Sequence, residues 1–119
     1  MKISDGVGLM VIATLHELVG LVAGFSVTVD IARDGVVNAL GEDWMRQALF
    51  WFHVSGAALF IVGEALRTLE RATGSVPRRF GYLTVAIGLV GVVMLPASGF
   101  WLVLAWGARM VLRGRRVRA

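Results

Sequence analysis

The sequence predicts an all-α integral membrane protein, a four-helix bundle with both termini in the cytoplasm. Of its 119 residues, 57% are hydrophobic and only 17% are charged, whereas a soluble domain carries about a quarter charged residues. The apolar residues form long blocks, and a helix needs roughly 20 such residues to cross a bilayer. The basic residues are concentrated at the chain ends and between alternate apolar blocks, and this distribution indicates how many times the chain crosses the membrane.

Four helices account for the apolar blocks. We expect them over residues 6–29, 44–66, 80–95 and 100–112, as a single transmembrane domain covering residues 1–119. Barrel strands do not fit, because the blocks are long and do not alternate in polarity. Pro96, Ser98 and Gly99 separate the last two helices. One helix over residues 80–112 would be roughly 50 Å long, against a hydrocarbon core of about 30 Å.

Four crossings place ten of the twelve basic residues on one side of the membrane. These are Lys2, Arg67, Arg71, Arg78, Arg79, Arg109, Arg113, Arg115, Arg116 and Arg118. The positive-inside rule assigns that side to the cytoplasm, so we expect a multi-pass protein of the bacterial inner (cytoplasmic) membrane. Arginines beside apolar spans typically contact anionic head groups. Membrane lipids are therefore expected partners, and nucleic acid is not.

Several kinds of site are absent from the sequence. There is no cysteine, which excludes a disulfide framework, a thiol nucleophile and a cysteine-ligated metal. No nucleophile elbow, phosphate loop or metalloprotease motif is found. We therefore predict neither a metal nor a cofactor. The first apolar block is too long, and too polar at His16 and Glu17, for a cleaved signal peptide.

The stretch "TLHELVG" places His16 and Glu17 inside the first apolar block. Gly20 and Gly24 follow at helical spacing on the same face, where they allow another helix to approach closely. His53 lies on the second helix. Counting 1.5 Å per residue from the cytoplasmic ends puts Glu17 and His53 at similar depth on antiparallel neighbours.

An ionisable group at this depth suggests function. A charge at mid-bilayer costs at least about 2.5–3.5 kcal/mol, while a hydrogen bond between membrane helices returns about 1 kcal/mol. The leading hypothesis is acid–base catalysis on a lipophilic small molecule, by an isomerase or cyclase. Glu17 would be the acid or base, His53 its partner and His16 a third catalytic candidate. The residues expected to bind the substrate are Trp51, Phe60, Trp101 and Glu64.

Two alternatives use the same residues. A proton-coupled exporter would let Glu17 bind a proton and a cationic substrate in turn, and such an exporter would be a homodimer. A redox subunit would use His16 or His53 to ligate haem or to hydrogen-bond a quinone. Glu64 also has a plainer interpretation, because Arg67 at i+3 favours a surface ion pair.

The segments "LHELVG", "ALFWFHVSGAALFIVGE" and "GYLTVAIGLVGVVMLPASGFWL" together resemble an uncharacterised four-helix bacterial membrane family. That family is a domain of unknown function, similar to DoxX-like membrane proteins. The resemblance implies four helices and no activity. The chain also resembles the small multidrug resistance exporters in size and in its first-helix glutamate, where Glu17 would match their essential carboxylate. It departs from them in His53 and in lacking their third-helix tryptophan.

Overall fold

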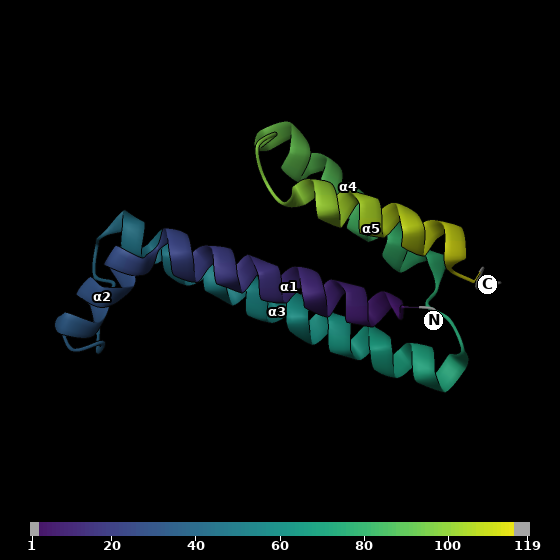
Figure 1. Ribbon diagram of the computed structural model, residues 1–119, viewed down its shortest axis with the longest axis horizontal. Helices are drawn as coiled ribbons and strands as arrows, with labels where there is room; N and C mark the ends of the chain where they lie inside the picture. Colours follow the sequence, from purple (N-terminus) through teal and green to yellow (C-terminus); the bar gives the residue numbers. More distant parts are fainter. Residues whose placement is uncertain (1–2, 116–119) are drawn as a thin grey trace.

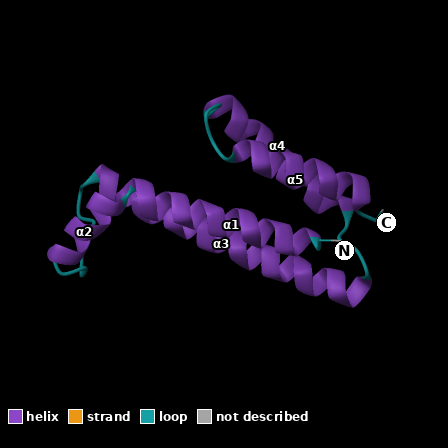
Figure 2. Cartoon of the chain, in the orientation of Figure 1, coloured by secondary structure: helices purple, strands orange, loops and turns teal. Residues whose placement is uncertain are grey.

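The computed structural model describes residues 3–115, which form α-helices joined by turns. The helices are α1 (Asp5–Ala23), α2 (Phe25–Arg33), α3 (Trp44–Thr73), α4 (Arg78–Met94) and α5 (Phe100–Arg113). The prediction of an all-α protein is confirmed over this range, in which no strand occurs (Figure 2). Lys2, Arg116 and Arg118, part of the predicted cytoplasmic charge, lie outside the described residues.

The helices form two antiparallel hairpins, α1 with α3 and α4 with α5, and the hairpins meet through α1 and α5 (Figure 1). A closed four-helix bundle would also bring α4 against α1 or α3, but among the described helices α4 packs against α5 alone. The physical reason is that most helical glycines face their own hairpin partner, whereas Gly8 of α1 faces Trp106 of α5. The close helix–helix contacts are therefore made within the hairpins.

The first predicted helix, residues 6–29, is divided at Gly24 into α1 and α2. A Cβ at Gly24 would collide with the Leu49 side chain, so α3 packs closely against this point of the chain. The Thr28 hydroxyl donates to the Gly24 carbonyl at 3.0 Å, and such side-chain bonds to the preceding turn bend helices. Helix α2 turns away from the hairpin (Figure 1) and has no buried residue.

Helix α3 is 30 residues long and runs past the predicted end at residue 66. At its start the Asp43 carboxylate accepts hydrogen bonds from the amides of Met45 and Arg46. Its last turns, "RTLERAT", combine residues of high helix propensity, so the helix continues beyond the apolar block. It ends at Gly74, whose φ of 82° is the left-handed conformation that glycine adopts readily.

The break predicted between the last two helices lies at Leu95–Gly99, between α4 and α5. The Ser98 hydroxyl donates to the Leu95 carbonyl at 2.6 Å, and the Trp101 indole donates to the Pro96 carbonyl at 2.9 Å. The first bond satisfies the carbonyl of the residue that caps α4, and the second joins α5 to the connecting segment.

A small core joins the hairpins at the end where both termini lie. It is formed by Leu9, Leu66, Val76 and Met110, all at most 4% exposed. Elsewhere large apolar side chains point outward, as at Val22, which is 80% exposed. Helices α1 and α3 are long and apolar enough to cross a membrane. Helices α4 and α5, at 17 and 14 residues, are shorter than a typical span.

Candidate functional site

Glycines on both helices bring α1 and α3 into close contact. A Cβ at Gly6 would collide with the backbone of α3 at Gly63 and Arg67, and a Cβ at Gly63 would collide with Gly6 and Met10 of α1. The two backbones thus approach more closely than larger side chains would permit. Polar side chains in the middle of this interface are held at short range as a result.

Glu17 and His53 form a hydrogen-bonded pair across this interface. The Glu17 Oε2 and His53 Nδ1 atoms are 2.6 Å apart, slightly closer than the usual distance of about 2.7–2.9 Å for a charge-assisted N–H···O hydrogen bond. The side chains are 33% and 27% exposed. With Glu17 ionised, its oxygen accepts and His53 Nδ1 donates, which leaves the lone pair of a neutral imidazole on Nε2.

Each member of the pair lies over a glycine of the opposite helix. A Cβ at Gly56 of α3 would overlap the Oε1 atom of Glu17, and a Cβ at Gly20 of α1 would come within 2.8 Å of His53 Cε1. The Glu17 Oε1 atom is buried and has no hydrogen-bond partner among residues 3–115. One carboxylate oxygen is thus bound to the imidazole while the other is covered by backbone.

His16 belongs to the same cluster but contacts the backbone of α3. Its Nε2 atom is 2.9 Å from the Phe52 carbonyl oxygen and 3.2 Å from the Ser55 hydroxyl, which itself donates to that carbonyl at 2.7 Å. Because a carbonyl oxygen only accepts, Nε2 carries the proton. The imidazole also stacks on the Phe52 ring, with 3.7 Å between the ring centroids. Neutral His16 therefore has its lone pair on Nδ1.

The four side chains predicted to bind a substrate are not joined to this cluster. Trp51 is 64% exposed and packs edge-on against Phe50, while Phe60 is 42% exposed on α3. Trp101 belongs to the other hairpin. Glu64 accepts from Arg67 at 3.0 Å in an exposed ion pair. Within residues 3–115, no hydrogen bond, ion pair or ring stack links any of the four to Glu17 or His53.

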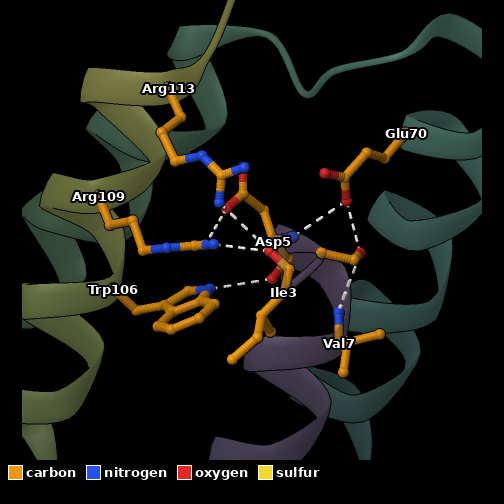
Figure 3. A network of polar contacts seen from close by, with 8 residues as sticks. Ile3, Asp5, Val7, Glu70, Trp106, Arg109 and Arg113 are labelled. Carbon is orange, nitrogen blue, oxygen red and sulfur yellow. Dashed lines mark hydrogen bonds and ion pairs between the residues drawn. The ribbon is translucent and has the colours of Figure 1, made fainter. Parts of the chain in front are cut away.

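A second polar centre, which the sequence analysis missed, lies where the hairpins meet (Figure 3). Asp5 is only 3% exposed and forms an ion pair with Arg109 of α5. The Trp106 indole donates to the Asp5 carbonyl at 2.9 Å, and the Arg109 guanidinium stacks over the Trp106 ring at 4.2 Å from its centroid. The buried charge is therefore paired, as buried charges in proteins usually are.

The same centre caps the first turn of α1. Ser4 Oγ accepts from the Val7 amide, and the Glu70 carboxylate accepts from both the Ser4 hydroxyl and the Asp5 amide (Figure 3). Glu70 on α3 thus satisfies an amide that the start of a helix leaves unpaired. Ser4 before an apolar run is a capping signal visible in the sequence. The partners 65 to 104 residues away are not visible there.

A family model matches residues 1–117, almost the entire chain, and its description is "Family of unknown function (DUF6463)". The chain belongs to the DUF6463 family. Curated proteins and solved structures give no match to the chain. The predicted resemblance to a family of unknown function is therefore confirmed in part. Kinship of this DUF6463 protein with DoxX-like proteins or with small multidrug resistance exporters stays a prediction.

Proposed function

We propose that this DUF6463 protein is a multi-pass protein of the bacterial inner membrane, with both termini in the cytoplasm. Two observations support this placement. Helices α1 and α3 have the length and hydropathy of membrane spans. The described arginines of the predicted cytoplasmic side all lie in the end segments of the two hairpins, at the end where the termini lie. Such a distribution agrees with the positive-inside rule.

The proposed function is proton transfer to and from a lipophilic small molecule, as in an isomerase or cyclase. The observation that carries it is the 2.6 Å contact between Glu17 Oε2 and His53 Nδ1. A carboxylate that accepts from Nδ1 orients the ring and stabilises the imidazolium that forms when Nε2 takes up a proton. His53 Nε2 is thus the proposed proton acceptor, and Glu17 is its positioning residue. This division of roles refines the prediction that Glu17 itself acts as acid or base.

The same contacts favour proton transfer over export. An exporter carboxylate must be free to exchange a proton for a cation. In this chain Glu17 Oε2 is bound by His53, and Oε1 lies against Gly56. A cation that binds Glu17 would therefore compete with His53 for Oε2.

Solvent deuterium tests the proposal without knowledge of the substrate. Membranes from cells producing the protein are incubated in heavy water, and lipid-soluble extracts are analysed by mass spectrometry. We expect at least one molecule to gain carbon-bound deuterium with the wild type. His53→Gln should abolish the gain, and Glu17→Gln should slow it about 100-fold, since general acid–base catalysis typically contributes 100-fold or more.

Thr14→Val provides the control for this experiment. Thr14 is exposed on α1, and its hydroxyl donates to the Met10 carbonyl of the preceding turn. This variant should incorporate deuterium as the wild type does. The proposal fails if the wild type incorporates none, or if His53→Gln incorporates as much. Loss of resistance to a lipophilic cation in Glu17→Gln, without deuterium incorporation by the wild type, would instead support the exporter.

A further inference from the structure

Among residues 3–115, five arginines at the shared end of the hairpins form no ion pair: Arg71, Arg113 and the three considered next. Arg78 and Arg79 begin α4, and Arg115 follows α5. None of them forms an ion pair within the part of the chain that the structure describes. The nearby carboxylates are otherwise engaged, Asp5 by Arg109, Glu64 by Arg67, and Glu70 by Ser4 and the Asp5 amide. We call Arg78, Arg79 and Arg115 the arginine cluster.

Hydrogen bonds to the backbone join two members of the cluster, Arg78 and Arg115. The Arg78 amide donates to the Arg115 carbonyl at 3.1 Å, and the Arg115 amide donates to the Val76 carbonyl at 3.1 Å. The Arg78 Nε atom also donates to the Gly114 carbonyl at 2.8 Å. The segment after α5 is thereby paired with the loop before α4. These bonds keep Arg78 next to Arg115, while the Arg79 guanidinium lies over the Phe80 ring, 5.3 Å from its centroid. With no ion-pair partner among residues 3–115, the three charges favour an external anion.

Exposed apolar side chains lie three or four residues along the chain from Arg79 and Arg115. Tyr82 and Leu83, three and four residues after Arg79, are 59% and 60% exposed, and Leu112, three residues before Arg115, is 80% exposed. Cationic groups next to an outward apolar surface match a molecule with an anionic head and an acyl tail. A soluble anion would gain nothing from the apolar side chains.

We propose that the arginine cluster binds the head group of an anionic phospholipid, whose acyl chains lie along α4 and α5. This inference rests on the membrane placement proposed above and not on the chemistry of His53. Each juxtamembrane arginine raises the affinity for anionic lipid about fivefold. Removal of two should weaken binding by about 30-fold.

Purified full-length protein in detergent is titrated with short-chain phosphatidylglycerol while its thermal unfolding is followed. Matched titrations use phosphatidylcholine of the same chain length and inorganic phosphate. We expect phosphatidylglycerol alone to raise the unfolding temperature with saturation. The double variant Arg79→Gln with Arg115→Gln should shift the half-saturating concentration about 30-fold upward. Arg78 is left unchanged because it also bonds the Gly114 carbonyl.

Two further variants make the outcome decisive. Arg33→Gln with Arg46→Gln removes the same charge in the α2–α3 region and should leave the half-saturating concentration unchanged. Arg79→Lys with Arg115→Lys keeps the charge and should bind nearly as the wild type does, so a folding defect can be recognised. Equal stabilisation by phosphatidylcholine or by inorganic phosphate overturns the proposal, as does undiminished binding by the glutamine variant. His53→Gln should bind phosphatidylglycerol normally, so the two proposals fail independently.

Discussion

The carboxylate of Glu17 lies directly over Gly56, at the position where any other residue would have its Cβ atom. This contact places the other carboxylate oxygen within hydrogen-bonding distance of His53. The pair therefore depends as much on a residue without a side chain as on its two ionisable members.

Gly56→Ala tests that dependence. The added methyl group would overlap Glu17 Oε1, so the carboxylate must move and its bond to His53 must break or lengthen. Overpacking of a close interface typically costs 1–3 kcal/mol, and we expect a loss of unfolding free energy in that range. Deuterium incorporation should fall toward that of Glu17→Gln. Both quantities are measurable on the same membranes and purified protein.

Gly99→Ala is the matched control. Gly99 has a φ of −71°, which alanine adopts without strain, and a Cβ there would meet no atom within 4 Å. Its stability and activity should equal those of the wild type. If Gly56→Ala had the same unfolding free energy and deuterium incorporation as Gly99→Ala, the predicted overlap with Glu17 would be shown to have no effect on stability or activity.

His16→Phe separates the structural role of His16 from a catalytic one. Phenylalanine can keep the stack on Phe52 but cannot donate to the Phe52 carbonyl, at a cost of about 1 kcal/mol for one hydrogen bond. Because His53 and Glu17 are bonded to each other, we expect deuterium incorporation to be retained within a few-fold. A 100-fold loss in a stably folded His16→Phe variant would place His16 in the chemistry.

Asp5→Ala should be the most destabilising single change at the junction of the hairpins. Removal of one partner from a buried ion pair typically costs 3–5 kcal/mol, since the other charge is left unpaired. Arg109 is 26% exposed, so water can screen part of that charge and we expect about 3 kcal/mol. Denaturant unfolding of the purified protein provides the measurement.

Asp34→Ala breaks a comparable but exposed pair with Arg46, in which the Asp34 side chain is 55% exposed. Exposed pairs are typically worth 0–1 kcal/mol, so this variant should unfold close to the wild type. If Asp5→Ala and Asp34→Ala lowered the free energy of unfolding equally, burial would add nothing to the strength of the Asp5–Arg109 ion pair.

The absence of cysteine makes the membrane topology directly testable. Single cysteines at Asn38, Ala72 and Ala97 would lie in the α2–α3 connection, in the last turn of α3 and in the α4–α5 connection, and all three positions are exposed. For a four-span protein with cytoplasmic termini, an impermeant maleimide should label Asn38→Cys and Ala97→Cys in intact spheroplasts. Ala72→Cys should react with the maleimide only after the membrane has been permeabilised. Labelling of Ala97→Cys only after opening would mean that α4 and α5 do not cross the membrane.

Much of the fold could be predicted because it depends on local chemistry. The apolar blocks predicted the helices, and Pro96 with Gly99 predicted the break before α5. Helical periodicity and a rise of 1.5 Å per residue brought Glu17 and His53 to the same level before any contact was known. The division at Gly24 could not be foreseen in this way, because it coincides with a contact to Leu49 on another helix.

The sequence by itself determined the helical class, the breaks marked by proline and glycine, and the shared depth of Glu17 and His53. These follow from propensity and periodicity, which are properties of neighbouring residues. Only the tertiary structure decided which carboxylate oxygen meets His53, that His16 bonds the backbone, and that Asp5 is paired with a residue 104 positions away. Those features depend on how segments far apart in the chain pack, which at the Glu17–His53 pair is determined by glycines on facing helices.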